Sequence, residues 1–361
     1  MGSPKNGDGP HFSYHSSEVK KMGSVPIFRC DATIAVQEEV PMHKLFIGAV
    51  LVALSAVAVA QPKYPQRTIE VVVPYAPGGG TDNLMRMITG IIDENKLSPV
   101  PLNVNNRAGG SGAVGFNYLI NKKGDSHVIA GATPMIVSGK IEGRLPGNHR
   151  DAMTTLMIVA IDELMLSVRA ESPFKTIDDF VSAARAKPGG LTVGGTATFT
   201  EDHIFTYLFE QAAKIRVKYV PFNSGGEVTA SLMGGHIDAA VENPNEIVAQ
   251  VEAGKARNLA VAARKRLADA PDVPTFAERG YEVYWDQMRG VVGPANMAPE
   301  AVKWWVDTLK KVTETKKWQQ DYIKRNLLTP VQWSGEEANK YLDGLHEKYE
   351  KALAGLKAAS K

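Results

Sequence analysis

The sequence is poor in cysteine, with a single residue, Cys30, in a chain of 361. Cys30 precedes a segment that we predict to be cleaved, so the mature chain would carry no thiol. Disulfide frameworks, thiolate metal sites, cysteine nucleophiles and CxxC redox chemistry are thereby excluded. With 44% hydrophobic and 22% charged residues, the chain is long enough for two domains that each bury a core.

The sequence also lacks an excess of charge of either sign. Lysine and arginine number 41, against 39 for aspartate and glutamate. No large field of one sign is available to attract nucleic acid or an anionic bilayer, so neither is expected as a partner. Any anion that the protein binds must therefore be held by local groups.

A long apolar stretch runs from Leu45 to Ala60, but it is shorter than the roughly 20 residues that a membrane-spanning helix needs. It follows the basic start of MHKLF and ends in an Ala-x-Ala site, which together are typical of a secretory signal peptide. We therefore predict a signal peptide over residues 42–60, cleavage after Ala60 and export to the periplasm. Residues 1–41 would be a non-native or wrongly assigned N-terminal extension, because a signal peptide begins its own reading frame.

Catalytic and cofactor motifs are scarce. There is no HExxH or other clustered metal-ligand spacing, and GGSGA around Ser111 misses the nucleophile-elbow pattern. A G-x-G-x-x-G match at 110–115 is followed by a strand that ends in GATP, where a dinucleotide site requires an acid. Glu201, Asp202 and His203 are adjacent, but neighbouring side chains on a helix diverge by about 100°. We predict no cofactor, no metal and no catalytic residue; a secreted hydrolase that uses His203 is the alternative from a different class.

Short apolar runs alternate with helical patterns along the rest of the chain. Residues 83–95 and 176–187 carry apolar residues at helical spacing. The alternation predicts an α/β architecture with mostly parallel sheets, and the part from Pro299 onward is predicted to be helical and to pack on the first domain. Strand candidates are residues 68–73, 101–106, 127–133, 164–170, 191–195, 217–222, 237–242 and 258–263.

The segment PYAPGGGTD, residues 74–82, lies between a predicted strand and a predicted helix. It lacks the lysine of a P-loop, and Asp82 would repel a polyphosphate. We interpret Asp82 as the N-cap of a helix that begins near Asn83, which leaves the amides of Gly79, Gly80 and Thr81 facing a ligand. Free amides at a helix start favour a carboxylate, whereas a tight turn with no ligand is the alternative.

Short neutral polar side chains gather after several predicted strands. In a doubly wound sheet such positions line the ligand crevice. Hydroxyl and amide groups suit a small carboxylate better than a reaction, because they hold charge by hydrogen bonding. The candidates are Thr133, Thr196, Thr198, Thr200, Asn223, Ser224, Asn243 and Asn245.

These segments occur together in a specific order. The chain contains YPQRTIEVVVPYAPGGGTDNLMRMI, NNRAGGSGAVGFNYL, GGTATFTEDHI, VKYVPFNSGGEVTASLMGGHIDAAVENPNE and MRGVVGP. From Gln61 to about Leu356 it resembles the substrate-binding receptors of tripartite tricarboxylate transporters, also called Bug proteins. SGGE with ENPNE is closer to the tricarboxylate-receptor branch of that family than to its amino-acid binders.

The resemblance implies two doubly wound α/β domains joined by a hinge with two chain crossings, as in type II periplasmic binding proteins. Domain 1 would comprise residues 61–163 and 289–361, and domain 2 residues 164–288. The loops 79–82 and 195–200 would be the two jaws, holding the ligand through backbone amides, hydroxyls and waters. The implied ligand-binding residues are Tyr75, Gly79, Gly80, Thr81, Asp82, Thr133, Pro134, Thr196, Thr198, Thr200, His203, Asn223, Ser224 and Asn243.

The resemblance also implies a function: a periplasmic, non-enzymatic receptor that delivers an organic carboxylate to a permease of one large and one small membrane subunit. Citrate or another tri- or dicarboxylate is the leading ligand and an aromatic acid the second, and we expect a monomer. A sensor that hands its ligand to a signalling partner stays open. Many relatives have glycine where this chain has Phe199, so its ring would narrow or line the pocket, and Glu242 would either face the ligand or be capped in the hinge.

Overall fold

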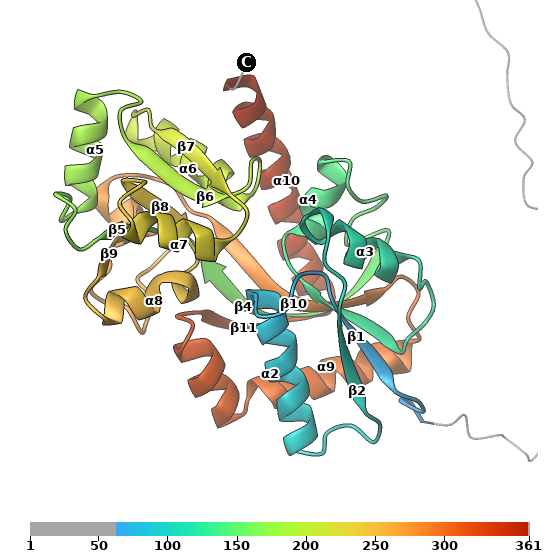
Figure 1. The fold of residues 1–361 in the computed structure, drawn as a ribbon. Coiled ribbons are helices and arrows are strands. Elements are labelled where there is room, and N and C mark those ends of the chain that lie inside the picture. The colour runs from blue at the N-terminus through green and yellow to red at the C-terminus, as the bar shows by residue number, and fades with distance from the viewer. Residues whose placement is uncertain (1–62, 360–361) are drawn as a thin grey trace, which may run out of the picture. The chain divides into compact units, whose positions relative to one another are not determined.

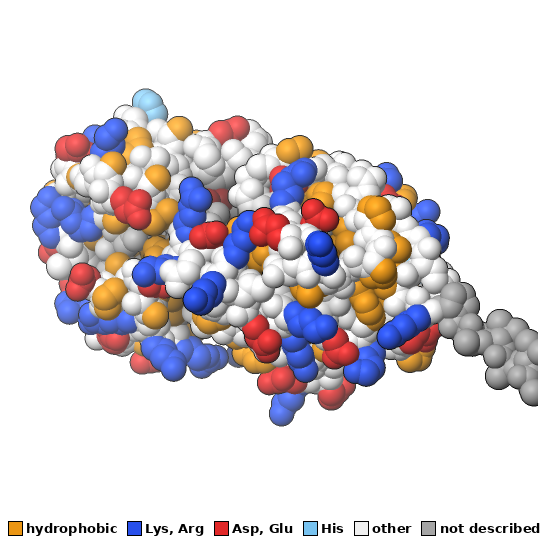
Figure 2. All heavy atoms as spheres, turned by 90° about the horizontal axis from the view of Figure 1, so that it is seen from below, with side chains coloured by type: hydrophobic (Ala, Val, Ile, Leu, Met, Phe, Trp, Pro, Cys, Tyr) orange, Lys and Arg blue, Asp and Glu red, His pale blue; other side chains and the backbone are white. Residues whose placement is uncertain are grey.

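The computed structural model describes residues 63–359. The predicted signal peptide and the segment before it lie outside the described residues, and residues 63–359 belong to one compact unit. Within the described part, no helix has the length and apolar character needed to cross a membrane. Lysine, arginine, aspartate and glutamate side chains are intermixed on the face shown in Figure 2, in keeping with the nearly balanced charge.

A first sheet, sheet A, has six strands in the order β11-β4-β10-β3-β1-β2 (Figure 1). Strand β1 pairs in parallel with β2 and β3, whereas the pairs β3–β10, β10–β4 and β4–β11 are antiparallel. Its strands are β1 (Ile69–Val73), β2 (Leu102–Asn106), β3 (Val128–Ala132), β4 (Met153–Glu163), β10 (Asp286–Pro294) and β11 (Thr329–Trp333). The helical segments that follow or flank them are α2 (Gly80–Glu94), η1 (Gly110–Gly112), α3 (Ala113–Ile120), α4 (Met135–Ile141), α9 (Pro299–Thr313) and η3 (Trp318–Lys324).

A second sheet, sheet B, has five strands in the order β7-β6-β8-β5-β9. Strand β6 pairs in parallel with β7 and β8, and β5 pairs antiparallel with β8 and β9. Its strands are β5 (Met165–Arg169), β6 (Thr192–Thr196), β7 (Lys218–Phe222), β8 (Ala239–Glu242) and β9 (Ala256–Val261). The helical segments are α5 (Ile177–Ala186), α6 (Glu201–Ala213), α7 (Gly225–Met233), α8 (Pro244–Glu252) and η2 (Ala277–Arg279).

The chain passes between the sheets along β4 into β5 and returns before β10. Only Leu164 separates β4 from β5, and it is fully buried. This arrangement confirms the α/β class with two sheets and two crossings. The expectation of mostly parallel sheets was wrong, because the two strands at the crossings, β4 and β10, make antiparallel pairs in sheet A.

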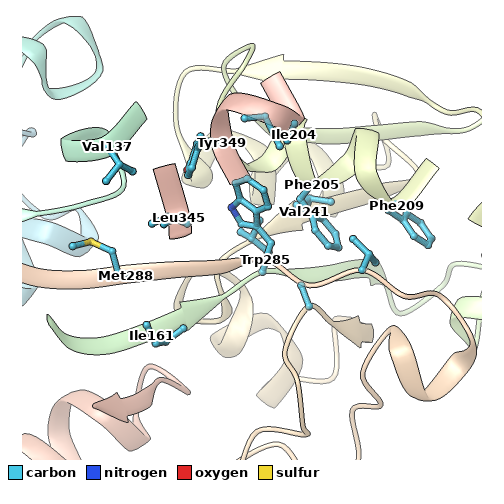
Figure 3. Close-up of a cluster of buried hydrophobic side chains, with 14 of the residues drawn as sticks. Val137, Ile161, Ile204, Phe205, Phe209, Val241, Trp285, Met288, Leu345 and Tyr349 are labelled. Atoms are coloured by element: carbon cyan, nitrogen blue, oxygen red, sulfur yellow. The ribbon is translucent and has the colours of Figure 1, made fainter. Parts of the chain in front are cut away.

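The C-terminal helix α10 (Gly335–Ala359) packs on elements of both sheets. It contacts α4 and β4 on the side of sheet A and α6 on the side of sheet B, whereas α9 packs on β4 and α2. Figure 3 shows Leu345 and Tyr349 of α10 between Val137 and Ile204. The Tyr349 ring meets Trp285 edge-on at 4.9 Å, and both side chains are buried. Packing on the first domain alone was therefore too narrow an expectation for α10.

Candidate ligand-binding site

A cavity of about 320 Å³ lies between the two sheets, and most of its lining follows the carboxyl ends of strands. Strands β1, β3, β6, β7 and β8 end at it, and the crossing strand β10 runs along it. Its lining comprises Tyr75, Gly79, Gly80, Thr81, Ser111, Thr133, Pro134, Met135, Ser138, Glu142, Arg144, Thr196, Ala197, Thr200, Glu201, Asn223, Asn243, Glu246, Gln287 and Arg289. Within the described part of the chain, no group of acids and histidines is arranged to hold a metal ion.

The cavity brings together most of the residues that the sequence nominated. Ten of them line it: Tyr75, Gly79, Gly80, Thr81, Thr133, Pro134, Thr196, Thr200, Asn223 and Asn243. Five lie outside the lining: Asp82, Thr198, His203, Ser224 and Asn245. Thr198 is exposed on the loop before α6, and the Ser224 hydroxyl accepts the Glu227 N–H at 3.3 Å as the N-cap of α7.

The first wall of the cavity is the start of α2. The helix begins at Gly80, three residues earlier than predicted, with Gly79 as its N-cap. The backbone N–H groups of Gly79, Gly80 and Thr81 have no acceptor in residues 63–359, and all three residues line the cavity. Of this loop's glycines, Gly78 carries the positive φ, 84°, whereas Gly80 is helical. A helix start with free donors attracts an anion.

Asp82 is the third residue of α2 and not its N-cap. Its carboxylate accepts the Gly78 N–H at 2.9 Å, Arg86 Nε at 2.9 Å and Asn106 Nδ2 at 2.9 Å. Burial alone would raise the pKa of Asp82, but these hydrogen bonds together lower it. Its charge is therefore satisfied behind the loop, which keeps the cavity-facing amides available.

Arg289 on β10 lies beside the same helix start. A Cβ atom built on Gly80 would be 3.0 to 3.2 Å from its guanidinium group. The Asp162 carboxylate accepts from Arg289 Nε at 3.0 Å and from Nη2, and the two side chains are only 11% and 1% exposed. Although burial opposes the charged form, Asp162 raises the pKa of Arg289, so the guanidinium stays charged.

One nitrogen of Arg289 is left for a ligand. Nη1 has no hydrogen-bond partner among the described residues. It is also not one of their fully buried polar atoms, so it keeps some contact with solvent. Arg289 lines the cavity. A carboxylate placed there would meet both a guanidinium N–H and the α2 amides, which is strong charge-assisted recognition.

The opposite wall is the loop that joins β6 to α6. Asp202 Oδ2 accepts the Thr196 N–H at 2.7 Å and the Thr196 hydroxyl at 2.6 Å, and Thr200 Oγ1 donates to the Thr196 carbonyl. Burial raises the pKa of Asp202 to about 8. The hydroxyls of Thr196 and Thr200, which were proposed to hold the ligand, are thus already used inside the loop. Glu201, the first residue of α6, lines the cavity instead, and burial raises its pKa.

His203 belongs to the back of this loop. Its Nδ1 accepts the Phe199 N–H at 3.2 Å, and its ring stacks on Tyr219 at 4.1 Å. Phe199 has a positive φ of 62°, so the histidine supports a conformation that a phenylalanine rarely adopts. Burial lowers the pKa of His203, which keeps the acceptor nitrogen unprotonated. The Phe199 ring is also absent from the lining and lies 5.9 Å from Lys357 Nζ of α10.

The ends of β7 and β8 complete the cavity. Asn223 donates through Nδ2 to Glu227 at 3.1 Å, and Asn243 Nδ2 donates to Gln287 Oε1 at 3.1 Å. Glu246 lines the cavity, and its Oε2 accepts the Asn243 N–H at 3.2 Å. Glu242 does not line it, because its carboxylate is buried against the Thr229 hydroxyl at 2.9 Å.

Sequence reasoning missed the charged half of the lining. Arg289 and Gln287 lie on β10, which is not among the predicted strands, although MRGVVGP is one of the segments that carry the family resemblance. Ser111 lies in the glycine cluster that the sequence marks as a false dinucleotide motif. The other missed residues are Met135, Ser138, Glu142, Arg144, Ala197, Glu201 and Glu246.

Comparison with known proteins identifies the family. The model of the tripartite tricarboxylate transporter family receptor matches residues 89–354. The chain belongs to this family. It is a family of solute receptors of transporters and not of enzymes, as the sequence predicted.

Individual relatives are distant but cover most of the chain. BugT of Bordetella pertussis is 25% identical over 72% of this chain and 80% of its own length. A protein encoded in the gbd 5' region of Cupriavidus necator is 27% identical over 76% of this chain and 83% of its own length. The chain therefore aligns with most of the length of these relatives.

Solved structures share the fold. A TctC solute-binding protein from Polaromonas, determined without ligand, is 27% identical with a TM-score of 0.68 and covers 81% of this chain and 99% of its own. A protein from R. palustris determined with adipate is 23% identical with a TM-score of 0.71, over 81% and 98% of the two chains. MatC from Rhodopseudomonas palustris with bound malate is 20% identical with a TM-score of 0.68, over 80% and 100%. The last two show the fold alone.

Proposed function

We propose that this receptor captures a small organic carboxylate in the cavity between the sheets and delivers it to a membrane permease of one large and one small subunit. The observation that carries the proposal is the start of α2, where the amides of Gly79, Gly80 and Thr81 and Nη1 of Arg289 are without acceptors among the described residues and line one wall. Membership of the transporter-receptor family supports delivery to a permease.

A di- or tricarboxylate such as citrate is the first ligand to test. Two proteins of the same fold were determined with adipate and with malate, both dicarboxylates, which supports this choice. An aromatic acid ranks second, since Phe199, the apolar ring expected near the ligand, does not line the cavity.

Residues 61–163 with 289–361 and residues 164–288 would act as the two closing domains. Their boundary falls near the crossings at Leu164 and β10, and the cavity takes residues from both. Ligand binding would then reduce the radius of gyration in solution scattering. The contact between Trp285 and Tyr349 of α10 would have to persist or rearrange during this closure.

Export to the periplasm would follow from cleavage after Ala60. N-terminal sequencing of material from the periplasmic fraction should give Gln61 as the first residue. Recovery of periplasmic protein with residues 1–41 intact would contradict it.

Co-purification with a membrane-embedded permease only in the presence of ligand would support the proposed partner.

The receptor role is tested by a thermal-shift screen against organic acids. A ligand present at about 100 times its Kd stabilises the folded state by roughly 2.7 kcal/mol, which is easily detected. After incubation, the best ligand should be recovered chemically unchanged. A product whose formation depends on His203 would contradict the receptor role and favour a hydrolase.

A further inference from the structure

The two walls of the cavity differ in charge. The α2 wall, formed by Gly79, Gly80, Thr81 and Arg289, offers hydrogen-bond donors, and the charge of Arg289 is paired with that of Asp162. The opposite wall, called the α6 wall, carries two glutamates: Glu201 at the start of α6 and Glu246 on α8. Burial raises the pKa of both carboxyl groups. Glu142 and Arg144 also line the cavity, but they form an ion pair with an N–O distance of 2.5 Å and largely neutralise each other.

The glutamates of the α6 wall occupy places where a second ligand carboxylate would otherwise bind. Glu201 is the first residue of α6, and an acid in the first turn interacts favourably with the positive end of the helix. Glu246 accepts the Asn243 N–H at the start of α8, and a Cβ atom built on Gly225 at the start of α7 would collide with its carboxylate. The positive ends of these helices are therefore next to carboxylates of the chain itself.

Gln287 adds a neutral donor between the walls. It is 8% exposed, and its Oε1 accepts from Asn243 Nδ2 at 3.1 Å. Gln287 lines the cavity, and its Nε2 has no hydrogen-bond partner among the described residues. This donor orients a polar ligand without offsetting the negative charge of the α6 wall.

We propose that the ligand has two unlike ends: a carboxylate bound at the α2 wall, and an ammonium or other hydrogen-bond-donating group that faces Glu201 and Glu246. The inference rests on the proposed receptor function, but it replaces di- or tricarboxylates as the first ligand class by ω-amino or similarly donor-bearing acids. A second ionised carboxylate at the α6 wall would be repelled by the two glutamates.

Calorimetry with matched pairs of ligands tests this asymmetry on the unaltered protein. The pairs are 6-aminohexanoate with adipate and 4-aminobutyrate with succinate, and hexanoate serves as the reference without a second polar group. At least one amino acid should bind about tenfold or more tightly than the diacid of equal length, as a charged hydrogen bond allows. Tighter binding of the diacid in both pairs would overturn the inference but leave the receptor function intact.

Replacement of one glutamate locates the effect. Glu201→Gln should reduce the ratio of amino-acid to diacid affinity about tenfold or more, because it removes the negative charge and keeps the side-chain shape. Glu300→Gln is the control, since Glu300 is an exposed first-turn residue of α9 away from the cavity. An unchanged ratio in a folded Glu201→Gln variant would contradict the inference. If neither these ligands nor any acid in the thermal-shift screen bound, the receptor function itself would fail.

Discussion

The starts of α2 and α6 follow the same strand–loop–helix plan but present opposite chemistry to the cavity. In α2 the acid is the third residue, Asp82, and its carboxylate turns back to Gly78, Arg86 and Asn106. In α6 the first two residues are acids; Asp202 turns back to Thr196, and Glu201 lines the cavity. The position of an acid within the first turn thus decides whether a helix start is open to an anion.

Of the substitutions proposed, that of Arg289 is expected to have the largest effect on ligand binding. Arg289→Gln should weaken carboxylate binding by about a hundredfold, because the α2 wall loses its charge. It should also lower the free energy of unfolding by about 3–5 kcal/mol, since Asp162 would be left buried and unpaired. Calorimetry and urea denaturation measure the two effects.

The double variant Arg289→Gln with Asp162→Asn separates them. It removes both charges of the buried pair and should recover most of the lost stability, while binding stays weak. Recovery of binding together with stability would mean that Arg289 serves only the fold.

The acids behind the α6 wall should make stability depend on pH. Burial raises the pKa of Glu242 to about 8, well above its value in an unfolded chain. The folded state therefore binds the extra proton, and the stabilisation is present at low pH and lost as the pH rises through about 8. Urea unfolding at pH 5.5 and 8.5 should show lower stability at the higher pH, by an amount on the order of a few kcal/mol.

Glu242→Gln should make this loss smaller, because the glutamine cannot ionise. The Glu300→Gln variant should keep the full pH dependence, since Glu300 is exposed. Equal pH dependence in the Glu242→Gln variant and the unaltered protein would show that Glu242 is ionised without cost in the folded state.

Gly80 and Gly90 offer a matched pair within α2. An Ala at Gly80 would press its Cβ against the Arg289 guanidinium, whereas a Cβ atom built on Gly90 would have no neighbour within 4 Å. Gly80→Ala should weaken binding about tenfold, and Gly90→Ala should leave binding unchanged while stabilising the helix by about 0.5–1 kcal/mol. Calorimetry on both variants measures the two affinities. Equal affinities would show that Gly80 does not contact the ligand.

The strands show which parts of the fold could be predicted from the sequence, and β10 is the most important one that could not. The eight predicted strands are all present, because most of them are short apolar runs between turn residues. Three strands were missed: β4 runs into β5 without a turn, β10 contains Asp286 and Arg289, and β11 contains Pro330. Arg289 could not be assigned to the cavity without β10, since only the pairing of that strand with β4 places it beside Asp162.

The α2 start shows a second limit. Glycine disfavours a helix, so the sequence favoured a start after Thr81 and made Asp82 the N-cap. In the structure Thr81 is buried, and its Cγ2 is only 2.5 Å from where a Cβ atom on Gly131 of β3 would stand. Tertiary packing therefore favours the earlier start, which local propensity could not reveal. The free amides of Gly79, Gly80 and Thr81 were nevertheless identified from the loop alone.

Thr200 should have the smallest effect. Its hydroxyl donates to the Thr196 carbonyl within the α6 loop, so it has no donor to spare for a ligand. Thr200→Ala should lower the free energy of unfolding by about 0.5–1.5 kcal/mol and change affinity severalfold at most. A loss of binding comparable to that of Arg289→Gln would place the ligand's carboxylate at the α6 wall instead.

The position of the ligand's carboxylate tests the account most directly. A crystal structure with the best-binding acid should place both carboxylate oxygens about 3 Å from donors of the α2 wall, namely the N–H groups of Gly80 or Thr81 and Nη1 of Arg289. The ligand's other end should then face Glu201 and Glu246. A carboxylate found at the α6 start, with the α2 amides left to solvent, would contradict the account.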